Sequence, residues 1–516
     1  MIPQRLRTHR RMAVAHAFVR PQSTPAQLEA LNAQVASLER IVLTLQGEVN
    51  TVREGLAAVQ ANNVQALDPF VSVDPNPETG VAGPHIIFSG ANVHIVSGSG
   101  ATDDGGTPLG LGNLIIGYDE DPTVQGGSPL NPGDRGGSHN LVIGRFHRFT
   151  QAAFGGLVAG ETNTISNASA SVSGGLNNTA DGKNASVSGG DSNIASGSAA
   201  SISGGGLNFA TGILASVSGG NSGTASGNNA SVSGGLSNTA SAVGASVSGG
   251  RHNTASGPTT TVSGGFSNTA SSSNIASIQD ASVSGGQNNT ASGSAANVSG
   301  GQNNTASGDN SSVSGGFGNT ASILNASVSG GQNNTAGGPG ASVSGGLKNT
   351  AGGTFASVSG GNGNTADDFF ASVSGGQNNS AGSGSNTAKG SAASVSGGQN
   401  NTASGPAASI SGGRLNTARG TSASVSGGNF NTASGGEASV SGGGGKIADG
   451  EDASISGGVG NNASGIFASV SGGRLNTASG NNASVSGGRN NTASGEDAVV
   501  IGGLNNTAPT LHSIAP

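Results

Sequence analysis

The sequence has no cysteine and no tryptophan, and Tyr118 is its one tyrosine. Without cysteine, disulfide bonds and cysteine-ligated metal centres are excluded. Charged residues make up 9% of the chain, whereas globular proteins usually carry roughly a quarter. Nucleic-acid binding requires concentrated lysine and arginine, and a net charge of −7 spread over 516 residues provides no such patch. We therefore expect no nucleic-acid partner.

Long apolar runs are missing as well. No stretch approaches the about 18 consecutive apolar residues of a transmembrane helix, so no membrane-spanning segment is expected. The glycine-rich phrases lack the Gly-Lys-Ser/Thr of a phosphate-binding loop. Calcium-binding nonapeptide repeats need recurrent aspartate, which the sequence does not have.

Clusters of residues that could carry chemistry are few. Asp103-Asp104 and Asp119-Glu120-Asp121 stand beside glycine or proline, which is typical of solvated loops. A second group gathers near one early phrase, and polar packing explains it better than a zinc or catalytic site; it contains His139, Arg145, His147 and Arg148. The sequence therefore predicts no enzyme, no catalytic residue, no cofactor and no metal.

What the sequence contains is a repeat. Ala-Ser-Val-Ser-Gly-Gly, two variable residues, Asn-Thr-Ala and a short turn first appear at Ala170 and recur 22 times, the last copy starting at Ala498. Of the 21 spacings between copies, 19 are 15 residues and the other two are 21 and 22. A short fixed period predicts stacked coils that are stable only together. We number the repeat positions from the first residue of each copy, so that Ala170 is at position 1.

Small apolar and hydroxyl residues alternate in each copy, which predicts two short strands per coil. The paired glycines and a glycine near position 13 (Gly174-Gly175 and Gly182 in the first copy) would form the corners. Position 3 is Val or Ile in every copy, and position 9 is Asn in all but two, which have Gly223 and Lys446. Stacked coils would give an apolar spine and an amide ladder. Disorder, the alternative for such a composition, would not preserve these phases.

A heptad pattern precedes the repeats. Thr24-Pro25 and Gln27 form a helix start, and Asp68-Pro69 forms a stop. Between them, apolar residues alternate at spacings of three and four, which predicts a coiled coil over residues 23–68. The a positions are Leu28, Val35, Val42, Val49 and Leu56, and the d positions are Leu31, Leu38, Leu45, Val52 and Val59. By residue preference, Val at a with Leu at d favours dimers.

The remaining segments have distinct characters. Residues 1–22 are basic and are expected to be a flexible tail, a docking peptide or, less well matched, a cleavable signal. Residues 69–112 form a junction in which 85–88 and 92–96 could pair as a hairpin. Residues 113–169 contain irregular coils with insertions, residues 170–508 the regular solenoid and residues 509–516 a tail. Two extra loops, around 271–280 and 382–392, should protrude from the same edge of the coils.

The cassette Ser-Val-Ser-Gly-Gly-x-x-Asn-Thr-Ala-Ser-Gly resembles the head repeat of trimeric autotransporter adhesins, the YadA-like left-handed parallel β-roll. The phrases 88–93, 138–144 and 154–158 are similar to those of an uncharacterised bacterial family with such arrays. The resemblance covers residues 170–508 well and 113–508 loosely, and it implies a trimer on the cell surface. The adhesins' isoleucine is Ser173 or Gly174 here, and their membrane-anchoring barrel has no counterpart in this sequence.

These observations predict a mainly β protein: a parallel β-solenoid or β-roll of 15-residue coils after an N-terminal coiled coil, forming a homotrimeric fibre. The expected role is structural and adhesin-like, extracellular or at the cell surface, with possible partners in further copies of the chain and in a glycan or surface receptor. Three alternatives stay open. They are a phage-type or contractile-injection tail fibre, an ice-binding protein that uses rows of hydroxyl groups, and a polysaccharide-active solenoid enzyme.

Overall fold

The computed structural model describes residues 24–60, 66–76, 80–121, 123, 128–131, 134–272, 280–378, 380–381 and 392–516. The predicted basic tail at 1–22 and most of the two extra loops lie outside these residues. The chain divides into two units, Met1–His94 and Ile95–Pro516. The protein is mainly β, with one long helix near its N-terminus.

Helix α1 spans Pro25–Gln60 in the first unit. It begins as the sequence predicts: the side chain of Gln27 reaches back and accepts a hydrogen bond of 3.2 Å from the backbone N–H of Thr24. No residue of α1 is buried, and the a and d side chains are 46–70% exposed. The helix therefore presents an uncovered apolar stripe within this chain.

The junction pairs differently from the prediction. Strand β2 (His85–Phe88) is antiparallel to β1 (Val71–Asp74), with Val71 opposite Phe88, and residues 92–96 form no strand. The N–H of Ser89 donates to the carbonyl of Phe70 at 2.8 Å, which extends the β1–β2 ladder by one residue. The hairpin partner is therefore the segment before β2 rather than the segment after it.

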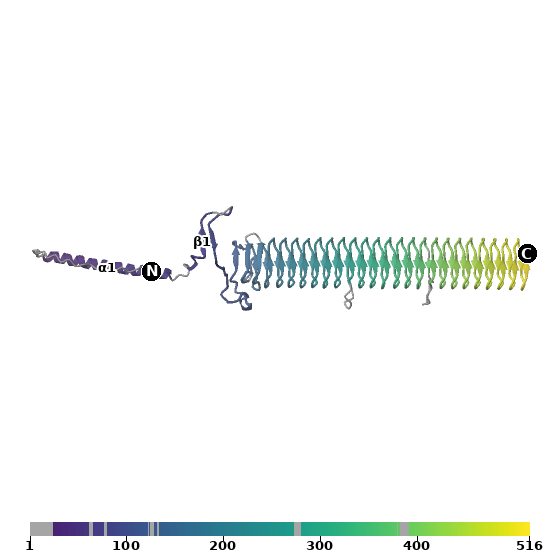
Figure 1. Cartoon of the computed structure of the whole chain (residues 1–516), viewed down its shortest axis with the longest axis horizontal. Helices are drawn as coiled ribbons and strands as arrows, with labels where there is room; N and C mark the ends of the chain where they lie inside the picture. Colours follow the sequence, from purple (N-terminus) through teal and green to yellow (C-terminus); the bar gives the residue numbers. More distant parts are fainter. Residues whose placement is uncertain are drawn as a thin grey trace. The chain divides into compact units, whose positions relative to one another are not determined.

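The second unit is a parallel β-solenoid of about 24 turns, whose coils stack along one axis (Figure 1). The irregular turns contain β3 (Leu114–Ile116), β4 (Leu141–Arg145), β5 (Arg148–Phe149), β6 (Leu157–Glu161) and β7 (Thr164–Ile165). In the regular turns, positions 2–3 form the even-numbered strands from β8 (Ser171–Val172) to β50 (Val499–Val500). Positions 10–11 form the odd-numbered strands from β9 (Thr179–Ala180) to β51 (Thr507–Ala508).

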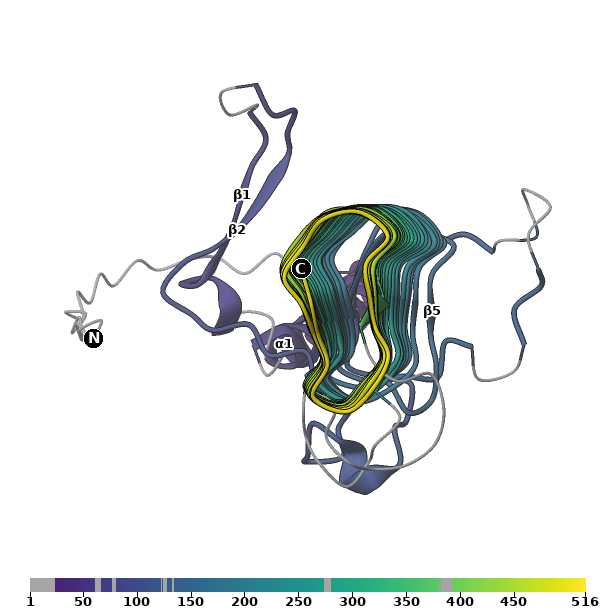
Figure 2. The same cartoon turned by 90° about the vertical axis from the view of Figure 1, so that its right-hand side faces the viewer.

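Residues 509–516, expected to be a tail, add one more strand. Strand β52 (Ile514–Ala515) pairs in parallel with β50, so the stack continues past residue 508. Seen end-on, the turns superimpose as one flattened loop (Figure 2). The two extra loops do not disturb this register, because Thr261 pairs directly with Ser282 and Ser372 with Ser394 across them.

Backbone hydrogen bonds join each turn to the next. In the first regular turn, the N–H groups of Ser171 and Thr179 donate to the carbonyls of Ala185 and Asn193 at 2.9 and 2.8 Å. A third line of parallel bridges runs along position 7, beginning with Leu176 opposite Asp191. At the opposite end of the loop the N–H of Ala199 donates to the carbonyl of Lys183 at 2.8 Å, so each turn is bonded to its neighbours on both long sides and at both ends.

The core consists of small apolar side chains. The Val or Ile at position 3 is at most 1% exposed in every copy, and the described alanines at position 11 are equally buried. Ser171 at position 2 is half-buried and Ser173 at position 4 is exposed. The alternation predicted from the sequence is confirmed: apolar residues point inward and hydroxyl residues outward.

Only one glycine of each Gly-Gly pair is required by the structure. Gly413 has φ of +85°, and a Cβ there would lie 2.2 Å from the carbonyl oxygen of Gly428 in the next turn. A Cβ on Gly412, one residue earlier, would meet nothing within 4 Å. The second glycine therefore allows the turns to approach at the spacing of the β-ladder.

The Gly413→Ala substitution should lower the stability of the solenoid by more than about 2 kcal/mol, because it combines a disfavoured φ with a clash against backbone. Thermal unfolding followed by circular dichroism would measure the loss. Gly412→Ala is the matched control and should unfold within a degree or two of the parent. Equal effects of the two substitutions would contradict this account of the corner.

Candidate functional site

The most regular polar structure in the molecule is an internal ladder formed by the asparagines at position 9. The N–H of Asn193 donates to Oδ1 of Asn178 at 3.0 Å. Its own Nδ2 donates to the carbonyls of Gly189 in the same turn and Gly205 in the next, at 3.1 and 3.0 Å. Each amide thus links three successive turns, and all its groups are satisfied.

The ladder predicted from the sequence exists, but its bonds run mainly from side chain to backbone. Equivalent hydrogen bonds recur at Asn208, Asn253 and later copies. At Asn208 and Asn253, Nδ2 donates to two glycine carbonyls and the backbone N–H donates to Oδ1 of the preceding asparagine. A direct amide-to-amide bond occurs between Asn193 and Asn178. Because such a buried network is satisfied within the protein, it serves cohesion rather than ligand binding.

Lys446 interrupts the ladder. Its N–H still donates to Oδ1 of Asn431 at 3.1 Å, but its side chain is 0% exposed and Nζ has no hydrogen-bond partner among the residues that the structure describes. Burial lowers the pKa of the Lys446 amino group below its ordinary value of 10.5. The next turn loses the side-chain acceptor that an asparagine would offer, so this turn is a weak point in the stack.

We predict that Lys446→Asn raises the free energy of unfolding by about 1–3 kcal/mol, because the substitution removes an unsatisfied buried group. The pKa of Lys446 is lower in the folded state than in the unfolded state, so its burial penalty is largest at low pH. The penalty shrinks as the pH rises through the folded pKa toward the unfolded one. Unfolding measured between neutral and alkaline pH should show this dependence in the parent and not in the variant.

Lys183→Asn is the control for lost charge, because Lys183 is exposed. It should change neither the midpoint nor its pH dependence. If Lys446→Asn were neutral or destabilising, the amino group would have a partner or solvent access that the structure does not show.

The ladder begins in the irregular turns with two other residue types. His147 is 0% exposed and takes the place of an asparagine: its Nδ1 accepts from the N–H of Asn163 at 3.3 Å, and Nε2 lies 2.9 Å from the carbonyl of Ile143. The N–H of His147 in turn donates to Oδ1 of Asp119 at 2.9 Å. This carboxylate is therefore the first member of the ladder.

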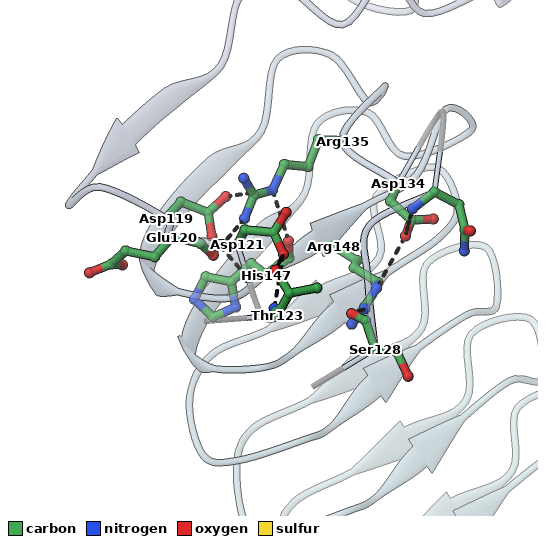
Figure 3. Close-up of polar contacts among 10 residues, drawn as sticks. Asp119, Glu120, Asp121, Thr123, Ser128, Asp134, Arg135, His147 and Arg148 are labelled. Carbon is green, nitrogen blue, oxygen red and sulfur yellow. Dashed lines mark hydrogen bonds and ion pairs between the residues drawn. The ribbon is translucent and has the colours of Figure 1, made fainter. Parts of the chain in front are cut away.

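Asp119 is 4% exposed and forms an ion pair of 3.2 Å with Nε of Arg135 (Figure 3). Burial raises the pKa of Asp119, while the N–H of His147 and the charge of Arg135 act in the opposite direction. A similar contact lies beside it, where Nε of Arg148 is 3.2 Å from Asp134. Arg135 also donates to the carbonyl of Glu120 at 3.0 Å and to the carbonyl of His147 at 3.3 Å, and the second bond ties the segment between β3 and β4 to the turn that contains His147.

The structure separates the four residues that the sequence places together. His147 bonds to Asp119 and Arg148 pairs with Asp134, as described above. His139 lies elsewhere, and its Nε2 accepts a hydrogen bond from the N–H of Ser97 at 3.1 Å. Arg145 pairs at 3.0 Å with Glu161 on the surface. Each of the four residues thus has a hydrogen-bond or ion-pair partner, while Nδ1 of His139 is buried with none among the described residues.

The acidic loop at 103–104 is held by its own neighbours. Asp104 accepts hydrogen bonds from the hydroxyls of Ser97 and Ser99 and, at 2.8 Å, from the N–H of Leu109. Hydrogen bonds, that of Ser138 first among them, hold the pKa of Asp104 well below its usual range. Its lone pairs are therefore used in shaping the loop.

In the described part of the chain, no group of three or more His, Asp or Glu side chains is arranged to hold a metal ion. Within the same residues, no helix has the length and apolar character needed to cross a membrane. The chain matches no protein-family model and no curated protein sequence. The comparisons therefore offer no relative from which a function could be transferred.

The exposed surface differs between the faces and the edges of the solenoid. The faces carry rows of serine and threonine in register, such as Ser231 and Ser246, whose hydroxyls are 3.1 Å apart. The edges carry most of the larger exposed side chains, although Phe209 and Ile447 lie on a face. Phe355 stacks on Phe370 with ring centroids 5.3 Å apart, and Arg251 lies 5.7 Å from the ring of Phe266. Any recognition of a specific partner therefore has its distinctive groups at the edges.

Replacing Asp119 tests the start of the ladder. Asp119→Ala leaves the buried N–H of His147 without an acceptor and should cost about 1–3 kcal/mol, seen as faster amide hydrogen exchange in residues 141–165. Asp119→Asn keeps an acceptor oxygen and should protect these amides.

The charge of Asp119 adds a pH dependence. Because burial raises its pKa in the folded state, the parent loses stability as the pH rises from the unfolded value of about 4 through the folded pKa. The Asp119→Asn variant should lack this loss. Identical exchange in both variants at every pH would show that the ladder does not depend on residue 119.

Proposed function

We propose that this chain is a subunit of an extracellular, adhesin-like homotrimeric fibre, in which α1 forms a coiled-coil stem and the solenoid a shaft. The observation that carries the proposal is the uncovered apolar stripe of α1. Ten a and d side chains on one stripe, all about half exposed, need a partner of the same kind to become buried. Each one buried would contribute about 1.5–3 kcal/mol.

Charge placement supports a parallel arrangement of these helices. In a parallel coil, a residue at g faces the following e residue of its neighbour. Glu48 occupies g and Arg53 the following e, so the pair is attractive in register. Ile41, 51% exposed, also occupies a g position and widens the apolar stripe. A wider stripe is covered more fully by two neighbours than by one, which favours three helices over two.

The solenoid suits a presenting role. Its turns repeat the same backbone, while the side chains exposed at the edges vary, as at His252, Phe430 and Leu475. Weak contacts at such sites would add up when three shafts are joined, because linked binding events raise avidity without new contacts. The low charge of the chain and the internally bonded asparagine ladder are consistent with a structural component.

Leu38→Glu should convert the trimer to monomers, because it places a carboxylate at a d position where three helices meet. Light scattering of the parent at micromolar concentration should give three times the 48.8 kDa of one chain, and the variant should give one chain's mass. Ser37→Glu, at the neighbouring exposed position, is the control and should remain trimeric.

The same proteins test presentation. On a glycan array or bacterial and host cell surfaces, the parent and Ser37→Glu should be retained, and monomeric Leu38→Glu should bind about 10²–10⁴-fold more weakly. A monomeric parent would refute the stem, whereas equal binding by trimer and monomer would refute multivalent presentation.

A further inference from the structure

The charges of the solenoid are sorted between its two edges. We call the segments at positions 5–8 the glycine edge, and the described residues between position 11 of one copy and position 1 of the next the turn edge. Each glycine-edge segment joins an even strand to the following odd strand, and each turn-edge segment joins an odd strand to the following even strand. From residue 251 onward, every charged residue of the glycine edge is a cation. They are Arg251, Lys348, Arg414, Arg474 and Arg489.

The turn edge has the opposite sign over the same turns. Among its described residues from 251 onward, Arg419 is the one lysine or arginine, and all other charged side chains are carboxylates. These are Asp280, Asp309, Asp367, Asp368, Glu437, Asp449, Glu451, Asp452, Glu496 and Asp497. The sorting is absent from the first turns, where Asp191 lies on the glycine edge and Lys183 on the turn edge.

The two rows are also related in register. Four of the five cations are followed, one turn further along and on the opposite edge, by a carboxylate. Arg251 is followed by Asp280, Lys348 by Asp367 and Asp368, Arg414 by Glu437, and Arg474 by Glu496 and Asp497. For Arg489 the corresponding segment is Pro509–His512, which has no carboxylate.

Within one chain these charges cannot meet at close range. Four residues of extended chain, about 13 Å, separate position 8 from position 12, and the two edges lie at opposite ends of the flattened loop (Figure 2). A second copy lying parallel and displaced by one turn, about 4.8 Å, would bring all four cations opposite carboxylates. Every repeat has the same rise, so the match holds along the whole shaft.

We propose that neighbouring solenoids of the fibre associate side by side and parallel, the glycine edge of one copy against the turn edge of the next. This inference rests on the trimer proposed above and identifies the surfaces that its shafts use. Because the two edges differ, the contact is heterologous, and such contacts close into a ring when the rotation allows it. A tilt of each solenoid against the fibre axis supplies the displacement of one turn within a closed ring of three.

Exposed ion pairs are individually weak, each contributing about 0–1 kcal/mol, and salt screens them. The contact should therefore depend on four pairs acting together and on ionic strength. At about 1 M salt the Debye length falls to about 3 Å, so the shafts should separate while the apolar stem stays assembled.

Lys348 permits a direct test, since a carbodiimide joins an amine to a carboxylate only where they touch. Light and nitrogen-15-labelled full-length chains are unfolded together, refolded, cross-linked and digested. We expect a peptide pair joining Lys348 of one isotope to Asp367 or Asp368 of the other, with a yield that falls several-fold between about 0.05 and 1 M salt. A cross-link confined to one isotope, or none in a confirmed trimer, would overturn the lateral contact and leave the stem standing.

Charge exchange gives a second test by small-angle scattering, which reports the cross-section of the fibre. Reversing the four cations (R251E, K348E, R414E, R474E) should separate the shafts, and so should reversing the carboxylates that follow them (D280K, D367K, D368K, E437K, E496K, D497K). Combining both sets should restore the compact cross-section, which a mere folding defect would not do. R489E, whose opposite segment has no carboxylate, is the control and should behave as the parent. Failure of the combined set to restore the cross-section would refute the pairing.

A monomeric mass for the parent would instead contradict the proposed stem. Light scattering measures this mass independently of the cross-section of the fibre. The two proposals therefore fail by different measurements.

Discussion

The structure depends on one constraint: the backbone of each turn must lie in phase with the next, so that its N–H groups meet the carbonyls of the following turn. Ser171 and Ala185 show the contact at 2.9 Å, and it recurs along both sheets to the end of the chain. Everything that could push turns apart is excluded from the interior, which explains glycine at φ near +85° beside the next turn's carbonyl. Extra residues are accepted between turns whose paired strands keep their register, as Thr261 with Ser282 and Ser372 with Ser394 show.

The core that results is too narrow for large side chains, and asparagine compensates for this. Alanine and valine fill the space between the sheets, and the buried amide of position 9 binds three successive turns through backbone groups. A hydrophobic side chain at this place could not satisfy the glycine carbonyls and the N–H that converge on it. Position 9 thus acts as a second, polar spine beside the apolar one, and this spine is interrupted at Gly223 and at Lys446.

Features that recur in every turn could be predicted from the sequence. Strands at positions 2–3 and 10–11, the buried residue at position 3 and the ladder at position 9 all follow from alternation and period, because many copies report the same environment. Features that occur once could not. The pairing of β2 with β1, rather than with residues 92–96, depends on a single register. Asp119 and His147 act as ladder members although neither is asparagine, and their separation of 28 positions gives no periodic signal.

The partners of the asparagine hydrogen bonds could not be predicted from the sequence either. The spacing shows that the asparagines stack, but it does not show which groups they bond. The same holds for partners: a heptad indicates that α1 has an apolar stripe, while the number of helices that cover it depends on contacts between chains. The edge on which a charged residue lies is easier to predict, because positions 7 and 14 lie at opposite edges of every turn.

The residue type varies between copies mainly at the edges of the solenoid. The backbone conformation at these positions is unfavourable for most residue types. Positions 8 and 15 adopt left-handed φ values, as at Asn177 (56°) and Asn184 (58°), and asparagine or glycine accepts them most readily. Phe355, Phe370 and Leu415 occupy the same conformation at 54–56°. Each non-glycine residue there costs about 1–2 kcal/mol, so bulky exposed residues at these places do not serve stability. A solenoid selected for backbone stability alone would keep asparagine or glycine at these places, so the backbone conformation does not explain the bulky residues at the edges.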